Sequence, residues 1–469
     1  MRLALLISVP IVVPAMVAAQ QLTPGAEIPL APPGYKMLRF DEDHSYLTNQ
    51  ANRSDLFDPV KYIPLRQDDP LWHATFGGEL RERYEGHYDP NFGIGGKGSD
   101  SYLLQRITLL TDVHLGERLR FFTEGISGII EGESQSAPPV QNNPIDLQFA
   151  FVDVVPWLKD DERLTLRVGR FGMSFGAGRL VATRAAPNIP FRFDGFEALY
   201  SRPAWNVTGF LTQPVKDSGH IDSEDHSTTF WGIYATHFFD APHTLGLDLY
   251  YLGIHREDGK YASGTADEHR HTLGAREFAA RNHWDWEAEQ MLQVGSFGDK
   301  SILAWSAAIN AGYTWDATWN PRLGLKAGAT SGDNNPNDGH LGTFDALFFK
   351  SGYFNDASLI RPQNIISVHP NFTVHPLQKV TVDGGVSPFW RYSRNDAVYA
   401  VPGFVEIPAL HNASGYVGTA FDVNLTRQLQ RHVNVQASYV HFLTGSYVHQ
   451  AGGSDVDYFS TTITFLLVP

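Results

Sequence analysis

The end of the chain alternates between apolar and polar residues. In the stretch DVDYFSTTITFLLVP, one face carries Phe459, Ile463 and Phe465, and the opposite face carries Ser460 and Thr462. A period of two residues predicts a β-strand. Because no later element follows to cover the apolar face, we expect this face to contact lipid.

The same alternation recurs along most of the chain in segments of about ten residues, the length of a tilted strand that crosses a bilayer. The segments lie near residues 76–86, 102–115, 118–130, 146–156, 163–170, 191–201, 204–214, 228–239, 243–255, 268–280, 283–297, 300–315, 320–331, 363–375, 378–393, 413–427, 431–445 and 456–468. They predict an all-β fold, a transmembrane antiparallel β-barrel of about 18 strands.

The links between these segments support the count. Links after even-numbered segments are short, such as Gly116-Glu117 and Arg202-Pro203, whereas links after odd-numbered segments are mostly long and polar, including 171–190, 256–267 and 332–362. Gly298-Asp299 is the exception. Barrels of the outer membrane have short periplasmic turns and long extracellular loops. The alternation of link lengths therefore predicts the orientation as well as the number of strands.

The first residues predict the compartment. Arg2, an apolar run to Val13 and the small residues before Gln20 are typical of a signal peptide, residues 1–19, cleaved near Ala19. An N-terminal membrane anchor is the alternative, but Pro10 and Pro14 interrupt the run. We expect a periplasmic N-terminal segment at residues 20–71, a barrel domain at 72–469, and a location in the bacterial outer membrane, with membrane lipid as a partner.

Composition narrows the possible functions. The chain has no cysteine, so disulfides and thiolate metal sites are excluded, and its net charge of −15 argues against nucleic-acid binding. A soluble β-solenoid would show a fixed short repeat, and we find none. The residue order indicates no nucleophile constellation, so we expect no enzymatic activity and no cofactor. The alternative to a transport function is an enzyme built into the barrel.

Charged side chains on barrel strands belong mainly on the lumen face, because a lipid-facing Arg or Lys costs about 2–4 kcal/mol at the midplane. This rule directs Glu79, Arg81, Arg83 and Glu85 inward. The other inward charges are Arg106, Arg120, Glu124, Arg167, Arg192, Asp194, Arg276, Glu287, Glu289, Arg322, Lys326 and Arg391. Clustered arginines attract carboxylates and bind them bidentately. The alternative is that they form structural salt bridges in the lumen.

The link from 171 to 190 is the most basic stretch. Its sequence, FGMSFGAGRLVATRAAPNIP, carries Arg179 and Arg184 without an acidic residue. Glycine-rich outer loops of this length often fold into the lumen, so we expect this loop to constrict it. The Gly-x-Gly is not followed by Lys-Ser/Thr, which excludes a nucleotide-binding phosphate loop.

Several stretches together resemble the alginate export family of eighteen-stranded outer-membrane barrels. They are GELRERYE (78–85), GRFGMSFGAGRLVATR (169–184), RFDGFEALY (192–200), RHTLGAR (270–276), PRLGLKAGATSGDNNPNDGHLGTFDALF (321–348) and FWRYSRNDAVY (389–399). The resemblance implies a porin for passive export of anionic polysaccharide, with periplasmic export components as possible partners. It implies substrate contacts at Arg81, Arg83, Arg106, Arg167, Arg170, Arg179, Arg184, Arg192, Asp194 and Arg391.

The sequence departs from this family in one respect that bears on the substrate. The well-known alginate exporter has a long periplasmic plug loop between its sixteenth and seventeenth strands, where this chain has only Thr426 to Arg431. The pore is therefore open at that end or gated differently. General uptake of small anionic nutrients is the alternative function.

Two weaker candidates for ion binding stand in the loops and strands. His269 and His271 share a strand face, where two imidazoles can ligate a metal, although such residues more often sit in the lumen or an interfacial girdle. The stretch SGDNNPNDGH offers oxygen ligands for calcium from Asp333, Asn335, Asn337 and Asp338. It lacks the distal Glu of an EF-hand, and such stretches are usually turns.

Overall fold

The computed structural model describes residues 36–96, 98–132, 140–219, 221–241, 243–401, 404–410 and 413–467. The predicted signal peptide and the last two residues lie outside the described residues. Within the described ranges, no helix combines the length and the apolar character needed to cross a membrane.

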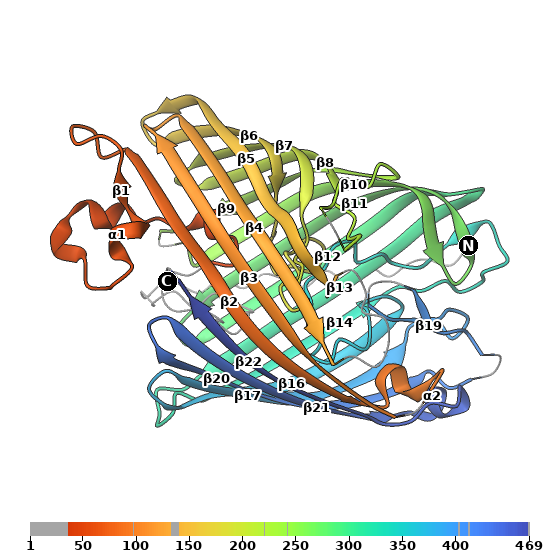
Figure 1. The fold of residues 1–469 in the computed structure, drawn as a ribbon. Helices are drawn as coiled ribbons and strands as arrows, with labels where there is room; N and C mark the ends of the chain where they lie inside the picture. Colours follow the sequence, from red (N-terminus) through yellow and green to blue (C-terminus); the bar gives the residue numbers. More distant parts are fainter. Residues whose placement is uncertain are drawn as a thin grey trace.

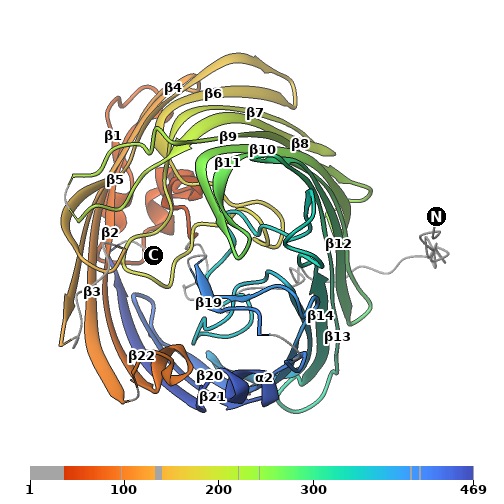
Figure 2. The same ribbon diagram turned by 90° about the vertical axis from the view of Figure 1, so that its right-hand side faces the viewer.

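Eighteen antiparallel strands close into a barrel, as the alternation predicted (Figures 1 and 2). Strand β22 closes the ring by pairing with β2, with Ile463 opposite Glu82. The barrel strands are β2 (Trp72–Tyr88), β3 (Ser99–Leu115), β4 (Leu119–Glu131), β5 (Asn143–Lys159), β6 (Glu162–Phe171), β7 (Phe193–Arg202), β8 (Trp205–Pro214), β9 (Thr228–Phe238), β10 (Leu245–Tyr261), β11 (Gly264–Arg281), β12 (Trp284–Phe297), β13 (Lys300–Thr314), β14 (Arg322–Thr330), β16 (Ile365–Leu377), β17 (Val380–Arg391), β20 (Tyr416–Gln430), β21 (Val433–Thr444) and β22 (Val456–Leu466).

Short elements accompany the barrel. Strand β1 (Ile63–Pro64) pairs with β2, β15 (His340–Leu341) pairs with β13, and β18 (Val398–Tyr399) pairs with β19 (Val405–Ile407). The helical pieces are η1 (Arg39–Asp41), η2 (Ser45–Thr48), η3 (Gln50–Asn52), α1 (Asp58–Lys61), η4 (Pro90–Gly93) and α2 (Ser446–Gln450). All of them lie in the N-terminal segment or in the links.

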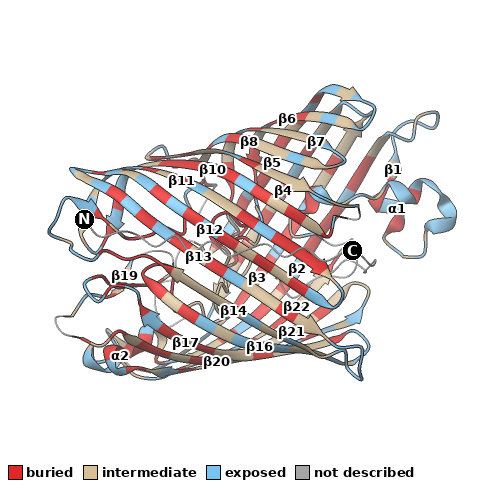
Figure 3. Cartoon of the chain, turned by 180° about the vertical axis from the view of Figure 1, so that it is seen from behind, coloured by how far each residue is buried: buried red, intermediate tan, exposed pale blue. Residues whose placement is uncertain are grey.

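The two faces of each strand follow the predicted alternation (Figure 3). On β13, Leu303 and Ile309 are exposed on the outside, whereas Ser306 is buried inside. On β3, Leu109 is exposed and Arg106 is buried. The exposed apolar rows form the lipid-facing band, and the charged rows face the lumen.

Glu82 lies on the outer face of β2, where a neighbouring polar side chain accommodates it. Its side chain accepts a hydrogen bond of 2.6 Å from Gln105 Nε2 on the neighbouring strand β3. The two polar groups therefore satisfy each other on the outer face of the barrel.

One predicted link is wrong. Residues 256–267 do not form a long loop, because β10 continues to Tyr261 and β11 begins at Gly264. This hairpin carries polar residues on both faces, so the apolar alternation that marks a membrane strand stops although the backbone pairing continues. The hydrophobic pattern reports the lipid-facing part of a strand and not its full length.

The N-terminal segment lies at the end of the barrel that carries the short turns, which is the periplasmic end (Figure 1). His432, in the turn between β20 and β21, approaches Asp55 with an Nε2–Oδ2 distance of 2.6 Å. Arg120 on β4 donates to the backbone oxygen of Phe40 at 2.6 Å. The segment is therefore fixed to a periplasmic turn and also enters the lumen.

Candidate pore site

Two long links fold back into the barrel and pair with each other inside the lumen. We call them inner loop 1 (residues 172–192, between β6 and β7) and inner loop 2 (residues 331–364, between β14 and β16). Val181 and Phe348 form a parallel bridge. Ala182 N donates to Phe348 O at 2.9 Å, and Phe348 N donates to Leu180 O at 2.8 Å. The two loops therefore act as one structure across the lumen.

Two glycines allow inner loop 1 to lie close to the barrel wall. Gly176 and Gly178 have φ angles of 55° and 69°, a region that favours glycine. A Cβ atom on Gly176 would lie 2.5 Å from the hydroxyl oxygen of Tyr234 on β9. The glycine-rich composition of this link thus serves both its turn and its approach to the wall.

Part of the lumen is a packed apolar core. The lumen-facing rings of Phe193 on β7 and Phe230 on β9 each lie with their centroids 5.0 Å from that of Phe348 in inner loop 2. Leu180 and Val181 of inner loop 1 are buried in the same cluster. The inner loops are therefore held by hydrophobic burial as well as by polar contacts.

Arg179 anchors inner loop 1 to the barrel wall through two carboxylates. Its Nη1 lies 2.6 Å from Glu289 Oε2 and its Nη2 lies 2.7 Å from Glu287 Oε1, both on β12. Glu287 also binds Arg276, whose Nη1 reaches Asp248 on β10 at 2.8 Å. A predicted substrate-contacting arginine is thus part of a buried ion-pair network.

Most of the other predicted arginines are paired in the same way. Arg192 binds Asp146 and Asp222, and Arg170 binds Asp194 at 2.8 Å. The remaining partners are Asp153 and Glu197 for Arg167, Glu79 for Arg106, and Glu85 for Arg83. The alternative of structural salt bridges thus describes this part of the lumen.

Arg184 has a weaker partner. Its Nη2 lies 3.4 Å from Asp217 Oδ2, and its guanidinium carbon lies 3.7 Å from the ring centroid of Phe191. Burial lowers the pKa of Arg184 to about 10, and the charge of Asp217 offsets this only in part. The side chain stays charged at neutral pH and is the most weakly neutralised cation of inner loop 1.

Three lumen cations donate to backbone carbonyls, and within the described ranges none of them has an ion pair with a carboxylate. Arg81 on β2 donates to the carbonyls of Ala185, Ala186 and Pro187 at 2.8–3.2 Å. Arg391 on β17 donates to those of Arg394, Asp396 and Ser414. Lys326 on β14 donates to that of Tyr353. The alternation placed Lys326 in the lumen, but the family resemblance did not single it out.

Part of the N-terminal segment enters the lumen near the periplasmic end and packs against β4 and β5. The ring centroid of Phe40 lies 5.1–5.6 Å from those of Phe122, Phe149 and Phe151 on β4 and β5. Arg39, beside it, lies 2.8 Å from Glu42. This contact could not be predicted from the sequence, because residues 36–71 carry no alternation. The link between the sixteenth and seventeenth strands is short, as predicted, and residues 38–42 lie inside the lumen against β4 and β5 instead.

The side chains of three of the four proposed calcium ligands are engaged in turns. Asp333 Oδ1 accepts from Asn335 N at 3.0 Å, Asn335 Oδ1 from Asn337 N at 3.3 Å, and Asp338 Oδ1 from His340 N at 2.8 Å. These side chains therefore support the local backbone. His271 is likewise engaged, because its Nδ1 lies 2.8 Å from the hydroxyl of Tyr251.

The alginate export family matches residues 73–461, and the chain belongs to that family. No curated protein sequence matches the chain. Its fold is shared by solved porins. OpdK of Pseudomonas aeruginosa, solved with vanillate, has a TM-score of 0.58 and 11% identity over 84% of this chain and 98% of its own. A BenF-like porin from Pseudomonas fluorescens has a TM-score of 0.58 and 8% identity over the same shares.

A third solved porin adds a different ligand. OccK2 (OpdF) of Pseudomonas aeruginosa, in complex with glucuronate, has a TM-score of 0.55 and 10% identity over 84% of this chain and 96% of its own. At these identities the likeness shows the fold alone. Family and fold together place the chain among outer-membrane transport porins.

Proposed function

We propose that this outer-membrane barrel of the alginate export family passes carboxylate-bearing polysaccharide, such as alginate, passively through its lumen. One observation carries the proposal. Arg81, Lys326 and Arg391 face the lumen and donate to neutral carbonyl oxygens of the links. A carboxylate that reached these cations would replace a neutral acceptor with a charged one.

Replacing a neutral carbonyl acceptor by a carboxylate strengthens the hydrogen bonds of these cations, so the lumen favours anions. Hydrogen bonds between ionised partners are about twice as strong as neutral ones, and arginine can bind a carboxylate bidentately. The arginines that are already paired with Asp or Glu gain less, because an arriving carboxylate only replaces an existing one. We therefore assign the substrate path to the carbonyl-bound cations and a structural role to the ion-paired arginines.

Passage requires the inner loops to move. They are joined to the wall by the Arg179 ion pairs and to each other by the Val181–Phe348 bridge. Displacing the carbonyls of 185–187 and the side-chain oxygen of Asn188 from Arg81 frees its guanidinium and loosens inner loop 1 in the same step. For export, polymer would arrive at the periplasmic end, where residues 36–71 lie and where periplasmic export components would dock.

Uptake of small anionic solutes is the second candidate. The packed inner loops favour it, because a narrow path suits a small acid better than a polymer. Two of the three similar porins were solved with vanillate or glucuronate, both small carboxylates. Both candidates use the same cations, and they differ in the direction of transport and in the width of the open path.

Single-channel recording in planar bilayers tests the proposal. We expect anion selectivity and a current block by polymannuronate added on the periplasmic side. Block by monomeric glucuronate with no effect of the polymer would favour the uptake porin. Cation selectivity of the native protein would contradict both candidates.

A further inference from the structure

The hairpin of β10 and β11 carries a cluster of metal-binding side chains on its outer face. His255 lies directly opposite His269 in the register of the two strands, and Asp267 precedes His269 by two residues on the same face. Neighbouring strands place the small side chains of Thr229 and Ser296 at the flanks of this pair. The row therefore has two imidazoles at its centre and a small polar side chain on each side.

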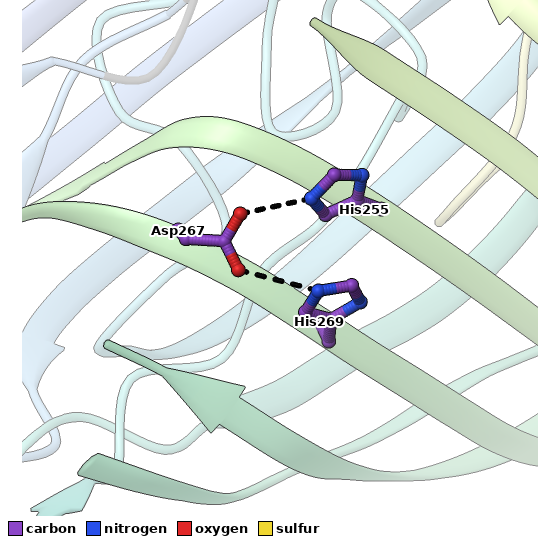
Figure 4. A group of neighbouring side chains, drawn as sticks. All are labelled: His255, Asp267 and His269. Atoms are coloured by element: carbon purple, nitrogen blue, oxygen red, sulfur yellow. Dashed lines mark hydrogen bonds and ion pairs between the residues drawn. The ribbon is translucent and has the colours of Figure 1, made fainter. Parts of the chain in front are cut away.

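The three side chains already converge (Figure 4). One oxygen of Asp267 lies 2.9 Å from His255 Nε2, and the other lies 3.2 Å from His269 Nε2. The imidazole rings are nearly parallel, with an interplanar angle of 13° and centroids 4.2 Å apart. The three ligand atoms all lie within 4.8 Å of one another. The backbone pairing on both strands holds them in this arrangement.

The cluster lies beyond the lipid-facing band. Leu249 and Leu273 are exposed on the same outer face, towards the periplasmic end. Tyr251, His271 and Trp231 follow, joined by contacts of 2.8 and 3.3 Å, as in an interfacial aromatic girdle. His255 is four residues further, about 13 Å along the strand at 3.3 Å per residue. The cluster therefore meets water at the extracellular rim.

We propose that His255, Asp267 and His269 bind a divalent first-row transition metal ion such as Zn²⁺. Imidazole nitrogen and carboxylate oxygen suit these ions, with ligand distances of about 2.0–2.2 Å. Ligand atoms within 4.8 Å of one another reach such distances by small side-chain rotations, with the metal replacing the hydrogen bonds between them. Three protein ligands leave a fourth position open to water.

A bound ion at this site would stabilise the hairpin. The ligands come from both strands, so a bound ion joins β10 to β11 where the hairpin projects past the membrane. Calcium and magnesium prefer oxygen ligands, so they should not replace the transition metal. The alternative is that Asp267 only hydrogen-bonds the two histidines, in which case no ion binds.

Competition between the purified full chain and a chromophoric zinc chelator tests the site. The protein carries no polyhistidine tag, and Zn²⁺ is the only transition metal added. We expect the native chain to bind one more equivalent of Zn²⁺ than His255→Gln or His269→Gln does. If a variant still binds that equivalent, its affinity for Zn²⁺ should be at least about tenfold lower than that of the native chain. Calcium in excess should leave the result unchanged.

Two controls keep the result interpretable. His226→Gln removes an exposed histidine from the link between β8 and β9 and should leave zinc binding unchanged. Heat-modified mobility in gels verifies that each variant keeps a folded barrel. Equal zinc binding by the native chain and both single variants, with all barrels folded, would overturn the site.

Discussion

Arg81 and Arg106 lie directly opposite each other in the register of β2 and β3, and both donate to the carbonyl oxygen of Ala185, at 2.8 and 3.1 Å. Arg106 also binds Glu79 at 2.7 Å, whereas Arg81 has no carboxylate partner in the part of the chain that the structure describes. Two like charges are thus brought together around one neutral acceptor, and only one of them is neutralised by an ion pair.

Arg81→Gln should lower the selectivity of the channel for anions and weaken current block by polymannuronate. Each lost contact between arginine and carboxylate corresponds to about 1.5–3 kcal/mol, or roughly tenfold to a hundredfold in affinity. Reversal potentials in a salt gradient measure the selectivity. Arg66→Gln is the matched control, because Arg66 is exposed in the N-terminal segment and pairs with Asp68. Equal selectivity in the two variants would exclude Arg81 from the path.

Arg179→Met should destabilise the barrel and release inner loop 1. Removing the arginine leaves Glu287 and Glu289 buried without this partner, and breaking a buried ion pair costs about 3–5 kcal/mol. We expect a lower unfolding temperature and a larger single-channel conductance. Adding Glu289→Gln, which leaves the ion pair between Arg276 and Glu287 in place, should restore part of the stability. No recovery in this double variant would mean that the loss comes from packing.

Phe40→Ala should open the periplasmic end of the lumen. The ring packs on Phe122, Phe149 and Phe151, and its removal weakens the attachment of residues 38–42. We expect higher conductance or more frequent full openings in planar bilayers. Leu56→Ala in the same segment is the control, because Leu56 is 85% exposed. An unchanged conductance in Phe40→Ala would show that this segment does not limit the current.

The attachment of the N-terminal segment should weaken in acid. Burial raises the pKa of Asp55 and of Asp58, but hydrogen bonds outweigh this effect. The bond from His432 holds the pKa of Asp55 below 3.8, and the bond from Lys61 lowers the pKa of Asp58. A depressed pKa contributes stability that is present above the unfolded value of 3.8 and is lost as pH falls through the folded value. Amide hydrogen exchange of residues 36–71, corrected for the intrinsic pH dependence, should show less protection at pH 3 than at pH 6. Asp55→Asn should remove part of this dependence.

Surface labelling checks the orientation of the barrel. Asn335 is exposed in inner loop 2 on the extracellular side, and Lys159 is exposed next to a short periplasmic turn. An epitope tag inserted at Asn335 should be labelled on whole cells, and one at Lys159 should be labelled only after the outer membrane is permeabilised. The reverse pattern would invert the topology.

The sequence alone determined the wall of the barrel. Each strand presents one face to lipid and the other to the lumen. Alternate residues must therefore be apolar, and this pattern can be recognised within a single strand. This is why the strand count, the outward row of Leu303 and Ile309 and the inward position of Arg106 could be predicted. The pattern ended too early on β10, because beyond the membrane neither face of a strand must be apolar.

Only the tertiary structure decided what fills the barrel. Arg179 and Glu289 are 110 residues apart, and Phe40 meets β4 and β5 only because the N-terminal segment turns back into the lumen. Such contacts depend on barrel closure and on the path of irregular links, which have no period in the sequence. His255 faces His269 for the same reason: the register of two strands, and not the spacing along one of them, brings these imidazoles together.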